Sequence, residues 1–279
     1  MNDTFKIKII SNNIIYHLME WQTILFISVV LLLLYVVWVY VSGDVSMLNK
    51  SVTAGNVMTT ITPSSYSSAN NFDSSNFTYS VWFYIDDWNY RYGETKELIQ
   101  RSIAVPSDSG SSTREGMSGI AGDMDDISAK QPSPFVMFAP KENNLIIALT
   151  CFTNNSTADV GVVHYVEVVN IPIQKWVNLY FSVYGRTIDI YINGKLVRTG
   201  ILPGPAKILS TANLYLTPNG GFKGWTSKFQ YFNTASNPQA AWDTYQKGWG
   251  ESLLGSLLGK YKVKMSLLVD NKEEAQVTI

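Results

Sequence analysis

The clearest hydrophobic pattern in the chain is a strict alternation of apolar and polar positions over residues 176–199. In Trp176–Tyr184, valine, leucine and phenylalanine take every second position, and a period of two is typical of a β-strand with one buried face. The alternation returns in Thr187–Ile192, where three isoleucines share a face. A Gly-Arg pair at 185–186 and an Asn-Gly pair at 193–194 separate the runs, and Asn-Gly favours a two-residue hairpin because a type I′ turn needs positive φ at both central positions. The pattern predicts a three-strand meander at the centre of a β-sandwich.

The Asn-Gly turn also predicts which residues face each other across the hairpin. A two-residue loop at 193–194 sets Ile190 opposite Val197 on one face and Asp189 opposite Arg198 on the other. An apolar pair and a pair of opposite charges are both favourable across neighbouring strands. We therefore expect Asp189 to have a structural role beside Arg198.

Strand-like runs recur along the rest of the chain and are joined by turn-forming residues. We expect strands at 77–85, 96–104, 135–139, 145–152, 162–169, 213–217, 224–232 and 261–267. Asn237 followed by Pro238 predicts the N-terminus of a single short helix that stops at Gly248. Residues 106–131 lack periodicity and predict a long loop. About ten short strands and one helix indicate an all-β sandwich or jelly roll.

The N-terminal region carries a different pattern, a run of 23 uncharged residues between Glu20 and Asp44. Fourteen of them are Leu, Ile, Val or Phe, and each favours membrane insertion by roughly 0.3–0.6 kcal/mol. The run matches the ~20 residues that cross a bilayer, and aromatic residues lie at both ends, where interfacial aromatics belong. We therefore predict a single transmembrane helix over 21–43, with membrane-spanning residues that include Trp21, Leu25, Leu31, Leu34, Trp38 and Val41.

Two other interpretations of this run are a cleaved signal peptide and a buried core helix. The apolar region of a signal peptide is usually 7–15 residues, which is shorter than this run, and a core helix would be unusual in a β domain. Lys6 and Lys8 precede the run and Lys50 alone follows it closely, which favours an N-terminus on the cytoplasmic side. The predicted organisation is a tail at 1–20, the span, a Ser/Thr/Asn-rich spacer at 44–75 in which NVMTTIT could add an edge strand, and a sandwich at 76–279.

Composition excludes some classes of function. The formal net charge is −1, and the chain has no basic stripe, RNP-type aromatic motif or zinc-finger spacing, so nothing favours a nucleic-acid partner. The one cysteine, Cys151, precludes a disulfide within the chain and lies in a strand-like run, where a small buried apolar residue is expected.

Four motifs give the chain a family resemblance: FTYSVWFYIDDWNYRYGE, NIPIQKWVNLYFSVYGRTIDIYINGKLVRT, LTPNGGFKGWTSKFQYF and NPQAAWDTYQKGWG. In this order, over roughly residues 75–250, they resemble the laminin-G-like (concanavalin A-like lectin/glucanase) domains encoded by large DNA viruses of algae. The resemblance implies an all-β, concanavalin A-like jelly-roll sandwich with one short C-terminal α-helix, here preceded by a single N-terminal transmembrane helix.

In such genomes, a sandwich behind a membrane span resembles the minor capsid proteins that link an icosahedral shell to an internal membrane. The resemblance therefore implies a non-enzymatic structural protein of the virion, located at the interface of membrane and capsid. Its partners would be the lipid bilayer and capsid proteins of the same particle. The alternative is a membrane-anchored lectin that binds glycans.

Catalysis is not expected. The glucanase branch of the resembled superfamily uses two carboxylates on one strand face, whereas Glu167 and Asp189 have no acidic partner two or four residues away. Two histidines, His17 and His164, make no case for a Ser-His-Asp set, and there is no P-loop or Rossmann glycine pattern.

Two features predict binding, and each has a simpler interpretation. In GDMDD, Asp123, Asp125 and Asp126 could supply oxygen ligands to Ca²⁺, although the spacing fits no EF-hand loop and exposed acidic residues are usually only solvated. No other cofactor is implied. In DDWNYRYGE, four side chains could form a surface for a sugar or a protein partner, or could simply cover the end of the sandwich: Trp88, Tyr90, Arg91 and Tyr92. The three later tryptophans, Trp225, Trp242 and Trp249, are expected in the core or against the helix.

Overall fold

The structure is a computed structural model that describes residues 46–65, 74–106, 127–152 and 161–250, the backbone of 264–269 and 272–278, and seven residues between 24 and 35. The chain divides into two compact units, Met1–Val45 and Ser46–Ile279. In the first unit the described residues are helical and exposed, and Leu31 is the one predicted membrane-spanning residue among them. Trp21, Leu25, Leu34, Trp38 and Val41 lie outside the described residues. Within the described part of the chain, no helix is long and apolar enough to cross a membrane.

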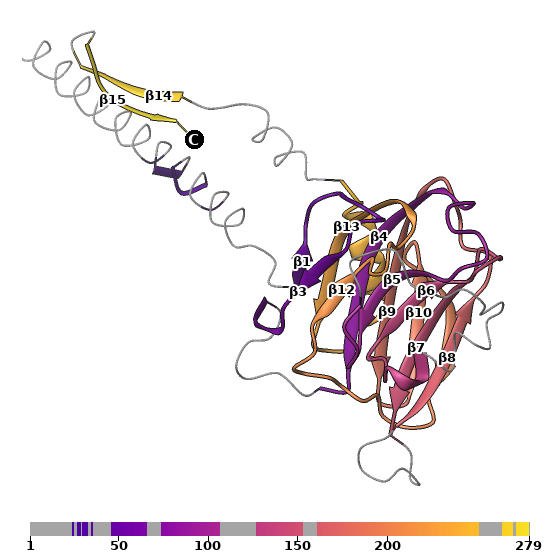
Figure 1. Cartoon of the computed structure of the whole chain (residues 1–279). Helices are drawn as coiled ribbons and strands as arrows, with labels where there is room; N and C mark the ends of the chain where they lie inside the picture. The colour runs from indigo at the N-terminus through magenta and orange to yellow at the C-terminus, as the bar shows by residue number, and fades with distance from the viewer. Residues whose placement is uncertain are drawn as a thin grey trace, which may run out of the picture. The chain divides into compact units, whose positions relative to one another are not determined.

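The second unit contains two facing antiparallel sheets (Figure 1). The seven-stranded sheet has the order β1-β13-β4-β9-β10-β11, with β2 also paired to β13. Its strands are β1 (Met47–Asn49), β2 (Thr53–Ala54), β4 (Phe77–Asp87), β9 (Trp176–Tyr184), β10 (Thr187–Ile192), β11 (Lys195–Ile201) and β13 (Lys223–Phe232). The six-stranded sheet has the order β3-β12-β5-β6-β7-β8. Its strands are β3 (Thr59–Ile61), β5 (Lys96–Arg101), β6 (Phe135–Phe138), β7 (Leu145–Cys151), β8 (Val162–Val168) and β12 (Leu214–Leu216). The all-β sandwich predicted from the sequence is confirmed.

The central meander forms as predicted, but its second hairpin has a different register. Asn193 and Gly194 both have positive φ, and Ile192 pairs with Lys195 across the two-residue turn. Beyond Tyr191 the register shifts, so Ile190 faces Arg198 rather than Val197. The expected pairing was wrong because β11 contains an extra residue at this point, a β-bulge that moves each later residue by one position.

The bulge changes the role of Asp189. This residue pairs with Thr199 rather than Arg198, and its carboxylate accepts a hydrogen bond from the Thr199 hydroxyl at 2.6 Å. Arg198 instead donates from Nη1 to the main-chain oxygen of Glu167 at 2.7 Å. The side chain therefore connects the edge strands β11 and β8 of the two sheets.

The apolar faces of the strands meet in one core between the sheets. The alternating residues Val177, Leu179, Phe181 and Val183 of β9 are all buried in it, as are Phe77, Tyr79, Val81, Phe83 and Ile85 of β4. Phe181 stacks on Tyr79 with ring centroids 5.4 Å apart. The faces predicted from the alternation are therefore correct.

The opposite face of β9 is also buried, although the alternation predicted a half-exposed strand. Tyr180 packs in a second cluster with Tyr191 of β10 and Ala241 of α3 (Pro238–Gln246). Asn237 caps the helix by accepting from the Ala240 N–H at 2.9 Å, as its sequence position predicted. The short helix thus covers the outer side of the seven-stranded sheet.

Two stretches differ from the predicted organisation. Within the predicted spacer, β3 is the edge strand expected in NVMTTIT, and it pairs with β12. The same stretch also contains β1 and β2, which were not predicted and pair with β13, because backbone hydrogen bonding to a sheet needs little apolar pattern in the sequence. Near the C-terminus, β14 (Lys264–Val269) pairs with β15 (Lys272–Thr278) in a separate two-stranded sheet instead of joining the sandwich. A strand in a separate hairpin and a strand added to the sandwich show the same alternation of apolar and polar residues, so the sequence pattern alone does not distinguish them.

Candidate binding surfaces

The aromatic loop predicted as a binding surface follows β4 and closes one end of the sandwich. Trp88 donates from Nε1 to the main-chain oxygen of Lys141 at 3.2 Å and packs edge-on against the core residue Phe138. Tyr90 donates from its hydroxyl to the Gly220 carbonyl at 3.1 Å. These two aromatic residues therefore fasten the loop to neighbouring turns, which agrees with the covering role that the sequence left open.

Arg91 and Tyr92, the other two residues of the predicted surface, differ in exposure. The Arg91 guanidinium forms an ion pair with Glu94 at 2.8 Å and donates to the Asn219 carbonyl, and its backbone has a positive φ. Tyr92 is 59% exposed. Of the four predicted residues, Tyr92 presents the most ring surface to a ligand.

A buried lysine lies beneath the loop. The Lys96 side chain is fully buried, its Nζ lies 4.7 Å from the centroid of the Trp88 ring, and it has no hydrogen-bond partner among the described residues. Burial, together with the positive charge of Arg91, lowers the pKa of Lys96 below its usual value of 10.5. The sequence did not predict this residue, because a lysine at the start of a strand is normally solvated.

Lys96→Met is expected to stabilise the protein at neutral pH, on the order of 1 kcal/mol, because it removes a charge that is desolvated without a hydrogen bond. The folded state holds this proton less tightly than the unfolded state, so wild-type stability rises with pH between the lowered pKa and 10.5. The advantage of the variant should shrink over that window. Denaturant unfolding at neutral pH and near the upper end of the window measures the difference in the free energy of unfolding between the two proteins. The same difference at both pH values would contradict a lowered pKa for Lys96.

The predicted calcium ligands Asp123, Asp125 and Asp126 lie outside the described residues. Within the residues that the structure does describe, no group of three His, Cys, Asp or Glu side chains could hold a metal ion. The calcium site therefore stays a prediction from the sequence.

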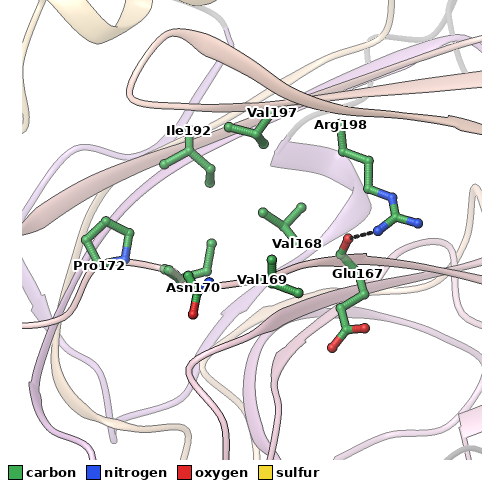
Figure 2. A pocket seen from close by; sticks show the side chains of 9 residues that line it. Glu167, Val168, Val169, Asn170, Pro172, Ile192, Val197 and Arg198 are labelled. Atoms are coloured by element: carbon green, nitrogen blue, oxygen red, sulfur yellow. Dashed lines mark hydrogen bonds between the residues drawn. The ribbon is translucent and has the colours of Figure 1, made fainter.

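A pocket of about 270 Å³ lies at one side of the sandwich, where the edge strands β8 and β11 approach each other. Its apolar walls include Val168, Ile192 and Val197 (Figure 2). Figure 2 also shows the Glu167 carboxylate pointing away from Arg198 while the main-chain oxygen of Glu167 accepts from that residue. The carboxylate instead accepts from Asn144 Nδ2 at 2.9 Å. The edge strand β11 also carries a bulge, Lys195 and the Arg198 side chain bonded to β8, and such features discourage the addition of a further strand at an open sheet edge.

Glu167 and Asp189, the two strand carboxylates considered for catalysis in the sequence analysis, accept structural hydrogen bonds. Glu167 belongs to β8 of one sheet and Asp189 to β10 of the other, and their carboxylates bind Asn144 and Thr199 respectively. They therefore lie in different sheets and do not share one strand face, which is the arrangement used by the glucanase branch of the resembled superfamily.

The three tryptophans expected in the core or against the helix are only partly buried. Trp225 is 42% exposed, Trp242 is 40% and Trp249 is 41%. Trp242 belongs to α3 and packs against the β10–β11 turn of the meander, because a Cβ added at Gly194 would meet its ring at 2.9 Å. Trp225 and Trp249 lie on the outer side of the seven-stranded sheet beside Tyr84 and Trp176.

The family comparison agrees with the two-sheet architecture. Residues 60–240 match the family model described as the concanavalin A-like lectin/glucanases superfamily, in its laminin-G-like form. The chain therefore belongs to this superfamily, and the resemblance of its domain is confirmed. No curated protein matches the chain.

Solved structures with a similar fold include binding domains of botulinum neurotoxins. The serotype G binding domain is 17% identical with a TM-score of 0.45, over 72% of this chain and 42% of that one. The binding domain of botulinum neurotoxin DC in complex with SialylT is 13% identical with a TM-score of 0.46, over 71% and 45%. This chain thus spans less than half the length of these proteins, and the likeness at such low identity concerns the fold alone.

Proposed function

We propose that the protein is a non-enzymatic structural component of a large DNA virus particle, a minor capsid protein that links the shell to the internal membrane. Residues 21–43 anchor it in the bilayer, and the concanavalin A-like sandwich contacts neighbouring capsid proteins. Binding, rather than bond cleavage, is the proposed task of the sandwich.

The observation that carries this proposal is the uncharged run of 23 residues over 21–43, which ends four residues before β1 begins at Met47. A run of this length matches the thickness of a bilayer and leads almost directly into a folded domain. The separation of Glu167 from Asp189, and their structural hydrogen bonds, support a domain without glycosidase chemistry.

Mass spectrometry of purified particles, combined with stepwise detergent stripping, tests the proposal. We expect the protein to be present and to be released together with lipid, because its attachment is the membrane span. Its absence from particles would refute the virion assignment, and its release by salt before lipid would refute the anchor.

A second candidate is a membrane-anchored lectin, favoured by the exposed Tyr92 ring at the end of the sandwich. A glycan array on the full chain in detergent, with and without calcium, tests it. Tyr92→Ala should abolish any sugar binding at this surface, whereas Tyr184→Ala removes a tyrosine that is 69% exposed at the end of β9 and should leave binding unchanged. Trp88→Ala is a poor probe, because loss of its hydrogen bond and core contact would disturb the loop itself.

A further inference from the structure

A continuous row of aromatic side chains crosses three strands on the outer side of the seven-stranded sheet. Trp225 of β13 pairs with Tyr84 of β4, and Tyr84 pairs with Trp176 of β9. The ring centroids of Tyr84 lie 5.5 Å from Trp225 and 5.8 Å from Trp176. Trp249 then stacks on Trp176 at 4.5 Å, with the two rings inclined by 9°. We call these four residues the outer aromatic face.

The chain after α3 is held firmly at this face. The Ser227 hydroxyl donates to the Trp249 carbonyl at 2.8 Å, and Lys228 Nζ donates to the Gly248 carbonyl at 2.7 Å. The two outermost rings, Trp225 and Trp249, nevertheless keep about two-fifths of their surface exposed. A contiguous and fixed aromatic surface of this kind marks an interaction site more often than a scattered apolar residue does.

The charges around the outer aromatic face nearly balance. Four lysines and three aspartates lie on the neighbouring segments, namely Lys175, Lys223, Lys228, Lys247, Asp86, Asp87 and Asp243. Lys223 pairs with Asp87 at 3.6 Å, which reduces the positive charge further. An attraction that depends mainly on opposite charge is therefore not expected here.

The distance along the chain to the predicted span limits what can cover this face. The span ends at residue 43 and β1 begins at Met47, so the connection covers roughly 14 Å when fully extended. β1 pairs with β13, the strand that also carries Trp225. An anchored sandwich therefore keeps the strand of Trp225 close to the bilayer, and this raises the effective concentration of lipid at the face.

We propose that the outer aromatic face is a second membrane contact, which inserts Trp225 and Trp249 into the interfacial layer of the bilayer. Tryptophan and tyrosine favour this layer because their rings are apolar and their N–H and O–H groups remain hydrated. The inference rests on the proposed membrane anchor and adds an orientation: the seven-stranded sheet faces the lipid, and the six-stranded sheet faces away from it.

The single native cysteine makes this orientation measurable. Cys151 is fully buried, and burial raises the pKa of its thiol to about 11, so a thiol reagent at neutral pH reacts selectively with an introduced surface cysteine. Gly250→Cys places a label next to Trp249, where an added Cβ meets no atom within 4 Å. Thr60→Cys places the control label on exposed Thr60 of β3, in the six-stranded sheet.

The experiment uses the full chain, labelled with a fluorophore at one of these positions and reconstituted into phosphatidylcholine vesicles whose headgroups carry a nitroxide quencher. We expect strong quenching at position 250 and little at position 60, and the same result with added phosphatidylserine or salt. Trp225→Ala and Trp249→Ala should each reduce the quenching at 250, whereas Phe152→Ala, which removes an exposed ring at the end of β7, should not.

Equal quenching at the two positions on vesicle-bound protein would overturn the second contact, as would quenching at 250 that survives both tryptophan substitutions or requires phosphatidylserine. A neighbouring protein or a glycan as the occupant of this face would give the first of these results. Failure of the full chain to float with the vesicles is a separate result, and it would overturn the anchor in the proposed function.

Discussion

Phe181→Ala is expected to lower the free energy of unfolding by about 3–5 kcal/mol. Phe181 is completely buried between the sheets and stacks on Tyr79, so its removal leaves a cavity in the part of the core where the rings of β4 and β9 meet. Denaturant unfolding of the full chain in detergent, followed by tryptophan fluorescence, measures the change. The same strand supplies the control, because Tyr184→Ala removes a largely exposed ring and should change stability by less than about 0.5 kcal/mol. Similar losses for the two variants would show that β9 does not have the buried face described.

Gly224→Ala is the second large effect, with an expected cost of roughly 2–5 kcal/mol. Gly224 lies at a register shift between β13 and β4 and has φ +156°, and a methyl group there would overlap the Tyr84 carbonyl oxygen. The backbone of β4 cannot move aside without breaking its pairing with β13. Thermal unfolding compares this variant with Gly250→Ala, whose methyl group would enter open space. A Gly224→Ala protein as stable as the Gly250→Ala protein would contradict this close approach of the two strands.

The strands were predictable where side chains alternate and turns have distinctive residues. Thr187–Ile192 forms over the expected residues, because its isoleucines alternate and a turn bounds each end. The bulge opposite Ile190 was not predictable, because an inserted residue keeps the local composition and changes only which residues pair. Lys96 shows another limit: its burial depends on Trp88, which is held by a hydrogen bond to Lys141, far along the chain.

The candidate binding surfaces were likewise only partly predictable from the sequence. The aromatic loop was visible as a cluster in sequence, but only the fold shows that Trp88 and Tyr90 face inward while Tyr92 remains exposed. The outer aromatic face was not visible, since its members come from β4, β9, β13 and the segment after α3. Cross-strand register is what brings them together, and register is not encoded within any one of these segments.

Flotation of the full chain with lipid vesicles after an alkaline carbonate wash, compared with a chain that lacks residues 21–43, tests the central claim most directly. The anchored protein should remain with the lipid, because a membrane-spanning helix resists such a wash. The shortened chain should appear in the soluble fraction, since the interfacial contact of a few aromatic rings is weaker than a spanning segment. If the full chain were washed into the soluble fraction as well, the membrane anchor, and with it the proposed place of the protein in a virus particle, would be wrong.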